Sequence, residues 1–147
     1  YISMLGKEGL ATISRQAILN ANYLKTKIED AYELYQSAHC MHEFVATASR
    51  QKKNGVKALH IGKRLLDFGF HAPTVYFPIS VPEAMMIEPT ESETKESLDR
   101  FAAALLQIDS ESESDPDLVI NSPYGTPVRR LDEAAANRKP DLRWRSE

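Results

Sequence analysis

The sequence predicts an α+β domain with a small, about three-stranded and mostly antiparallel sheet, helices packed on one face, and an extended C-terminal tail. Segments with apolar residues three and four positions apart alternate with short β-branched or aromatic runs, the pattern of helices around a small sheet. Two of these runs are joined by a turn, which indicates a hairpin. Prolines and mixed charges replace apolar periodicity near the end. We therefore expect residues 1–116 to form the domain and residues 117–147 the tail.

The composition is that of one globular domain. The chain has 147 residues, of which 42% are apolar, and this length suffices for a real core. A net charge of −3 gives no indication of nucleic-acid binding, and no apolar run is long enough to span a bilayer. The single cysteine, Cys40, cannot form an internal disulfide and is compatible with a reducing compartment. The start lacks the pattern of a signal peptide and an initiator methionine, so we expect a piece of a longer protein.

The first predicted element is a long helix over residues 8–35. One apolar stripe recurs at helical spacing and consists of Ala17, Ala21, Leu24, Ile28, Ala31 and Tyr35. Asn20 and Asn22 are polar residues in this apolar neighbourhood. They either bond a neighbouring subunit or face water.

Residues 40–109 read as strand, helix, hairpin and helix. The first strand covers Met41–Thr47, and apolar groups on two faces indicate a buried helix over Val56–Phe68. Gly69 stands where a left-handed residue ends a helix. The hairpin consists of the strands Thr74–Ile79 and Ala84–Ile87, joined by the four-residue turn from Ser80 to Glu83.

The last predicted helix begins after Pro89. Thr90 and Glu93 have the spacing of a capping box, and Glu91 would add favourable negative charge to the first turn. The apolar face of this helix consists of Leu98, Phe101, Ala102, Leu105 and Ile108. The segment Asp109–Asp117 alternates acids and serines, so we expect a solvated linker or a frayed helix end. In the tail, Trp144 favours docking on a partner surface over free solvent.

Polar side chains occur at the ends of the hairpin strands and before the first strand. A functional site would place them there, but turns and helix caps would do the same. His39 and His42 flank Cys40, but no second ligand cluster follows, so we predict no metal site. His42 and Glu43 form a polar pair that serves either as a structural hydrogen bond or as a contact to a ligand held by another domain. Glycine-rich phosphate loops and a GxSxG elbow are missing, and no activated nucleophile is evident. The residues alone describe a domain with a polar edge, not a self-contained enzyme.

Several long motifs resemble one enzyme family, the glycine-cleavage P-protein, or glycine dehydrogenase (decarboxylating). They are AILNANY (17–23), CMHEFV (40–45), GKRLLDFGFHAPTVYFP (62–78), MIEPTESE (86–93) and LDRF (98–101). The match extends from Tyr1 to about Asp132. Two further motifs, TPVRRLDE (126–133) and LRW (142–144), look most like the C-terminal end of the second subunit of the bacterial two-subunit form.

This resemblance implies the C-terminal small domain of a fold-type-I enzyme that uses pyridoxal 5'-phosphate. The family is an oxidoreductase component that decarboxylates glycine and passes the aminomethyl group to the lipoyl arm of the H-protein. The Schiff-base lysine and the phosphate loop would lie in a large domain upstream of Tyr1, so we expect neither catalytic nor cofactor-binding residues here. The fragment alone is predicted to be inactive and not to retain the cofactor. The bacterial form implies a cytoplasmic location.

The implied partners are the large domain of the same subunit, the first subunit of the P-protein and the lipoylated H-protein. We expect no nucleic acid and no membrane as partners. The fragment by itself is expected to self-associate through the face that packs on the large domain. The alternatives are a stand-alone interaction or regulatory α+β domain without catalysis, and a degenerate, inactive subunit.

Six residues are expected to line the substrate-facing rim of the active site: His42, Glu43, His71, Thr74, Glu88 and Thr90. Two departures from related sequences stand out. Tyr124 occupies the place of a family histidine, and the strand Ala84–Ile87 lacks the carboxylate-binding arginine of many related aminotransferases. A substrate that must lose its carboxylate gains nothing from a strong ion pair to that group, which rationalises the missing arginine.

Overall fold

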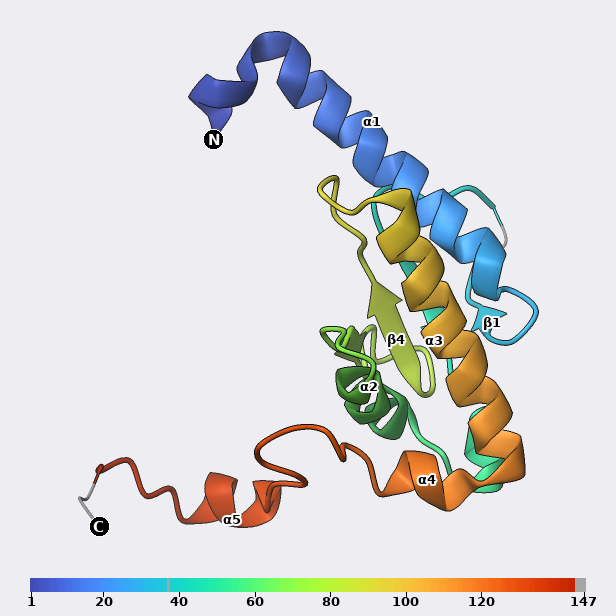
Figure 1. The fold of residues 1–147 in the computed structure, drawn as a ribbon, viewed down its shortest axis with the longest axis vertical. Helices are drawn as coiled ribbons and strands as arrows, with labels where there is room; N and C mark the ends of the chain where they lie inside the picture. Colours follow the sequence, from blue (N-terminus) through green and yellow to red (C-terminus); the bar gives the residue numbers. More distant parts are fainter. Residues whose placement is uncertain (37, 145–147) are drawn as a thin grey trace.

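A computed structural model describes residues 1–36 and 38–144, and it confirms the α+β fold class (Figure 1). One antiparallel sheet has the strand order β1-β2-β4-β3. Its strands are β1 (Glu33–Leu34), β2 (Phe44–Thr47), β3 (Thr74–Val75) and β4 (Ala84–Ile87). The helices are α1 (Ile2–Ile28), the 3-10 turn η1 (Gln51–Asn54), α2 (Ala58–Asp67), α3 (Lys95–Ser114), α4 (Pro116–Ile120) and α5 (Glu133–Arg138). The sheet thus has one strand, β1, beyond the three that the sequence predicted.

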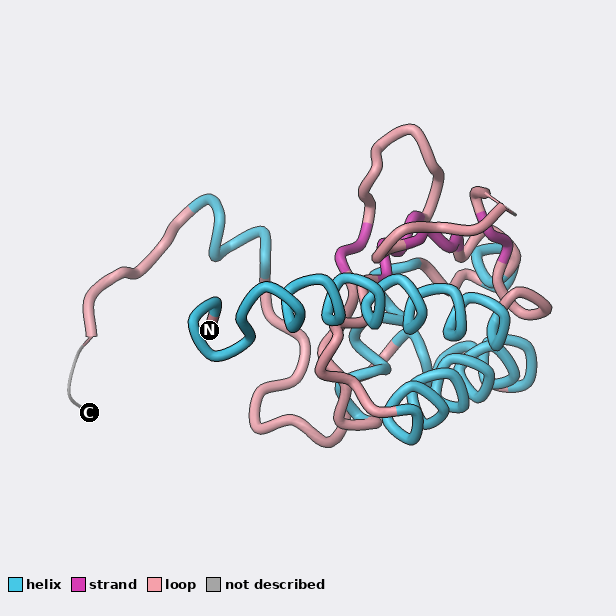
Figure 2. The backbone as a smooth tube through the Cα atoms, turned by 90° about the horizontal axis from the view of Figure 1, so that it is seen from above, coloured by secondary structure: helices cyan, strands magenta, loops and turns pink. Residues whose placement is uncertain are grey.

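The sheet buries one face against the helices. Phe44 pairs with Ile87, and Ala46 pairs with Met85; all four side chains are buried. Side chains alternate between the two faces of a strand, so these pairs share the face that meets the core. Figure 2 shows α1 and α3 side by side on one side of the body and the strands on the other. The prediction of helices on one face of a mostly antiparallel sheet is confirmed.

Helix α1 differs from the predicted helix at both ends. It begins at Ile2, is kinked at Gly6 (φ 64°, ψ −174°) and ends at Ile28, well before the predicted end at Tyr35. Past the helix end, Tyr32 is fully buried and its hydroxyl donates a 2.9 Å hydrogen bond to the carbonyl of Leu105. Apolar residues continue past the helix end, which is why periodicity alone overestimated its length.

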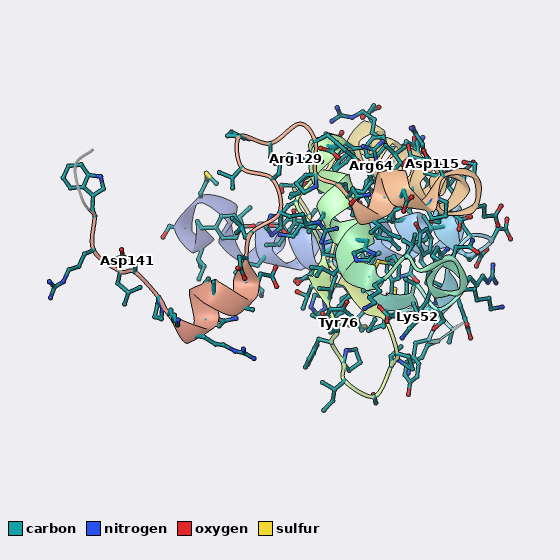
Figure 3. The ribbon with its side chains drawn as sticks, turned by 90° about the horizontal axis from the view of Figure 1, so that it is seen from below. Lys52, Arg64, Tyr76, Asp115, Arg129 and Asp141 are labelled. Carbon is teal, nitrogen blue, oxygen red and sulfur yellow. The ribbon has the colours of Figure 1, made fainter. Side chains whose placement is uncertain are left out.

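The strands are shorter than predicted. Strand β2 lacks the first three residues of the expected Met41–Thr47, and β3 ends at Val75 instead of Ile79. Tyr76 adopts a left-handed backbone conformation (φ 61°) that an extended strand does not allow, so it starts a longer connection to β4. This connection projects from the body, with Tyr76 at its base (Figures 2 and 3).

Helix α3 begins later and ends later than predicted. Its N-cap is Thr94, whose hydroxyl accepts a 3.2 Å hydrogen bond from the Ser97 amide, so the capping box of Thr90 and Glu93 is wrong. The Thr90 hydroxyl bonds Ser92 instead, at 2.7 Å. Glu91 and Glu93 precede the helix, although the Glu93 carboxylate accepts a hydrogen bond from the Ser97 hydroxyl.

The acidic and serine-rich segment is part of the folded body, not a solvated linker. Helix α3 continues through it to Ser114, and Ser112 is fully buried with its hydroxyl donating 2.7 Å to the carbonyl of Ile108. Glu111 accepts two hydrogen bonds from the Arg64 guanidinium, at 2.9 and 3.0 Å. A cation from α2 therefore neutralises one of the charges that made this segment look solvated.

The exposed tail begins later than residue 117. Asp115 caps α4, whose Val119 is fully buried, and Pro123 is buried as well. From Tyr124 to Trp144 the chain is exposed apart from the partly buried Thr126, and α5 extends away from the body (Figure 1). Trp144 is 87% exposed, so its expected docking concerns a partner outside this chain and stays a prediction.

The core lies between the helices and the inner sheet face. Its largest fully buried apolar side chains are Leu24, Ile28, Tyr32, Val56, Ile61, Leu65, Met85, Leu105, Ile108 and Val119. Among the described residues, no helix has both the length and the apolar character that crossing a membrane requires.

Candidate functional site

The antiparallel pairing of β2 and β4 brings two predicted site residues together. Phe44 is paired with Ile87, so the residues just before β2 lie beside those just after β4. The His42 Nε2 atom is 3.7 Å from Oε1 of Glu88 and 4.0 Å from Oε2 of Glu43. About half of the His42 and Glu88 side chains is exposed, at 53% and 54%, so this pair adds little stability. It remains accessible to a ligand.

A cavity of about 430 Å³ lies between the sheet edge and α3. Four predicted residues line it, namely His71, Thr74, Glu88 and Thr90. Its apolar lining includes Leu24, Met86, Leu98 and the rings of Phe70 and Phe101. These two rings meet edge to face with their centroids 5.2 Å apart, a favourable aromatic geometry. An apolar cavity with a few polar groups at its rim is the usual form of a small-molecule site.

A second cavity of about 300 Å³ lies between α1 and the loop before β2. Its apolar lining comes from Ile13, Ala17, Ile18 and Met41, and its polar lining includes His42, Glu88 and Thr90. Residues 88–90 line both cavities. We call this segment the 88–90 wall. The structure therefore groups all six predicted residues around the wall, with Glu43 joined through His42.

The end of α2 explains how His71 and Thr74 reach the larger cavity. Gly69 has a φ of 78° and donates a 3.0 Å backbone hydrogen bond to Leu66, while Phe70 donates to Leu65 at 3.0 Å. This left-handed ending is the one the sequence predicted, and it reverses the chain direction. The reversal carries His71 past α3 and leads Thr74 into β3.

The site also contains residues that the sequence left undecided or unassigned. Asn20 and Asn22 were expected to bond a neighbouring subunit or to face water, but both bond loops of this chain. Glu93 and Ser97 line the larger cavity as well. The position of Asn20 in an apolar neighbourhood was the signal available in the sequence, because an amide that is buried there needs partners.

The charge of the site is negative. Glu88 and Glu93 line the larger cavity and Glu91 the smaller one, whereas no lysine or arginine of the described chain is among the lining residues. The Tyr1 hydroxyl donates to Glu91 and holds the pKa of that carboxyl below its ordinary value. Within residues 1–36 and 38–144, no group of three or more histidine, cysteine or acidic side chains is placed to hold a metal ion.

Comparisons with known proteins place this site in context. A family described as "Glycine dehydrogenase, C-terminal domain" matches residues 13–120. A protein from Prosthecochloris aestuarii is 59% identical over 97% of this chain, and one from Shouchella clausii is 54% identical over 98%. A Thermotoga maritima protein is 53% identical over 99% of the chain. Each of the three is named "Probable glycine dehydrogenase (decarboxylating) subunit 2".

The chain is much shorter than these relatives. It spans 29% of the length of the Prosthecochloris and Shouchella proteins and 31% of the Thermotoga protein. The matched region includes both cavities, since residues 13–120 contain all of their lining residues.

Proposed function

This chain belongs to the family of glycine dehydrogenase C-terminal domains, and from that premise we propose that it completes the active site of a glycine decarboxylase. The full enzyme would use pyridoxal phosphate to decarboxylate glycine and pass the aminomethyl group to the lipoyl arm of the H-protein. The large domain of the same subunit and the first subunit would be its structural partners, in the bacterial cytoplasm. The similarity across residues 13–120 supports this proposal most strongly.

The residues around the two cavities do not fit pyridoxal phosphate by themselves. A Schiff base needs a lysine, and no lysine of the described chain lines either cavity. The lining carboxylates would repel the phosphate group of the cofactor. We therefore derive no step through the cofactor, and we propose that the large domain supplies the residues that hold it.

The role that we assign to this domain is to shape one side of the substrate space. The 88–90 wall would present Glu88 and Thr90 to the substrate, with His42 beside Glu88 and His71 and Thr74 across the larger cavity. Phe70 and Phe101 give the larger cavity an apolar wall, which would keep water from that side of the substrate and strengthen electrostatic interactions there. An acidic rim with no lysine or arginine among the described lining residues gives the glycine carboxylate no strong ion pair, which favours its loss over its retention.

The test uses the complete enzyme, assembled from both subunits with its cofactor and lipoylated H-protein. The exchange of labelled bicarbonate into the glycine carboxyl group reports decarboxylation and its reversal. We expect exchange in the natural enzyme and a loss of one to two orders of magnitude, roughly, in Glu88→Gln, because a rim charge placed against the reacting group is removed. Glu113→Gln is the matched control, since Glu113 is an exposed glutamate on α3 outside both cavities.

The two measurements test the proposed activity and the role of Glu88 separately. An assembled enzyme with bound cofactor but no bicarbonate exchange would exclude the proposed activity. Full exchange in Glu88→Gln would leave the activity standing and remove Glu88 from the active-site rim.

A further inference from the structure

We propose that Asn20 and Asn22 are positioning residues, which hold the two loops on either side of the smaller cavity and thereby set the approach of His42 to Glu88. The inference rests on the proposed function for its kinetic part only. Two side chains of α1 form hydrogen bonds with two loops that lie far apart in the sequence.

Asn20 holds the loop after β4. Its side chain is buried, at 3% exposure, and its Nδ2 donates to the carbonyl of Thr90 at 2.8 Å and to that of Glu93 at 3.4 Å. Its Oδ1 accepts a 2.8 Å hydrogen bond from Nε2 of Gln16, which fixes the orientation of the amide. The Thr90 carbonyl belongs to the 88–90 wall and the Glu93 carbonyl to the segment that follows it, so the wall is tied to α1.

Asn22 holds the loop before β2. Its Nδ2 donates to the carbonyl of Cys40 at 2.8 Å, and its Oδ1 accepts from the amide of the same residue at 3.0 Å. The side-chain amide thus bonds both backbone polar groups of one residue, through a donor and an acceptor, much as a neighbouring strand would. Cys40 lies two residues before His42, so this pair fixes the path that leads to the imidazole.

Helix α1 makes the two attachments act together. Ala21, between the asparagines, is fully buried, as are Leu24 and Ile28 in the following turns, so this part of the helix is fixed in the core. Each asparagine reaches a different loop from this common base. The pairing of β2 with β4 brings His42 and Glu88 together, and the asparagine attachments would hold the two loops at the 3.7 Å separation of Nε2 and Oε1, since this half-exposed contact is too weak to set it.

Both positions need the amide group. An aspartate has the same shape but donates no hydrogen bond when ionised, so it would place a carboxylate against the carbonyl of Thr90 or of Cys40. A buried group that loses its partner carries the full cost of its desolvation. The isosteric changes Asn20→Asp and Asn22→Asp should therefore release one loop each without creating a cavity.

The matched control is Asn54→Asp. Asn54 lies in η1, and its Nδ2 donates to the carbonyl of Ser112 at 3.1 Å, so the same bond type is lost. It lines neither cavity. All three variants are made in the full-length subunit and assembled with the partner subunit.

Hydrogen exchange with mass spectrometry gives the structural readout. Asn20→Asp should accelerate amide exchange in peptides covering residues 88–94, and Asn22→Asp in peptides covering residues 38–43. Asn54→Asp should change neither. Unchanged amide exchange of both loops in both variants would overturn the proposal.

Glycine kinetics give the second readout. A purely structural defect lowers the amount of active enzyme, which reduces kcat at unchanged KM, whereas displaced rim groups change how glycine is held. We expect KM for glycine to rise about tenfold in both variants, within the roughly hundredfold that an ångström-scale displacement can cost. If amide hydrogen exchange of the loops becomes faster but KM for glycine does not change, the positioning role is excluded. A natural enzyme without glycine turnover would reject the proposed function, while amide exchange would still decide whether the asparagines hold the loops.

Discussion

The carboxylate of Asp67 accepts a 2.6 Å hydrogen bond from the backbone amide of Tyr124, 57 residues further along the chain. It also accepts 2.7 Å from the Gly125 amide and 3.0 Å from Nη1 of Arg64. The last residue of α2 thus fastens the start of the exposed tail. Figure 3 shows Arg64 and Arg129 on the same side of the body, with Asp141 on the tail away from it. Tyr124, which the resemblance places at the position of a family histidine, is held here and lines neither cavity.

This attachment should weaken in acid. Burial raises the pKa of Asp67, but the Gly125 and Tyr124 amides and the Arg64 guanidinium outweigh it and hold the pKa below its ordinary value. A carboxyl group whose pKa is lowered by folding stabilises the protein above its unfolded pKa, about 3.9 for aspartate, and this stability is lost as the pH falls through the folded pKa. Calorimetry of the chain from pH 6 to pH 2.5 should therefore show a falling unfolding temperature below about pH 4. Asp67→Asn should show a shallower fall, and an equal slope in both proteins would contradict this role.

The Arg64–Glu111 pair should contribute measurably to stability. Both side chains are only 13% exposed, and two parallel hydrogen bonds join them. Glu111→Gln removes the charge and one acceptor, so the free energy of unfolding in urea should fall by about 2 kcal/mol. Lys95→Gln disrupts the exposed pair with Asp99 and should leave the urea midpoint unchanged. Equal effects of the two changes would show that burial does not distinguish these pairs.

Substitutions in α4 should lower the free energy of unfolding as core substitutions do, whereas substitutions in the tail should not. Val119 is fully buried, whereas Val128 is 62% exposed. Val119→Ala removes two buried methyl groups and should cost about 1.5–2.5 kcal/mol of unfolding free energy. The same change at Val128 should stay within about 0.5 kcal/mol. Urea unfolding of both variants measures the difference. An unchanged unfolding free energy in Val119→Ala would show that α4 does not contribute to the core.

The isolated chain should not form a specific complex with pyridoxal phosphate. No lysine of the described chain lines either cavity, and the buried Lys25 ammonium donates to the carbonyl of Ala38. Mixing should give only the weak absorption of nonspecific imines on surface lysines. A stoichiometric Schiff-base band that disappears on changing one particular lysine would overturn this prediction.

Local sequence patterns predicted the elements whose determinants are local. The apolar spacing located the main helices, and Gly69 ended α2 as expected. Strand β1 has only two residues and therefore no periodicity to detect. The start of α3 was misplaced because Thr90 and Glu93 have the spacing of a capping box, whereas the N-cap is Thr94. Asn20 bonds the carbonyls of Thr90 and Glu93 in the segment before the helix, and this donor lies 70 residues before Thr90.

The same limit applies to the candidate site. The resemblance grouped six residues, but their common location depends on the pairing of β2 with β4, which no spacing specifies. The acidic segment after residue 109 looked solvated because its cation, Arg64, lies 47 residues before Glu111. Partners that are this far apart in the sequence are brought together by the fold, so the residues next to them in the sequence do not reveal them.

The late position of α4 has a consequence for protein synthesis. Val119 and Pro123 complete a core whose other members come from earlier residues, and α4 packs against both α2 and α3. A nascent chain that ends before residue 119 exposes the apolar groups that these residues cover. Folding of this domain on the ribosome must therefore wait for its final core segment, and until then the growing chain depends on chaperones or on speed to avoid aggregation.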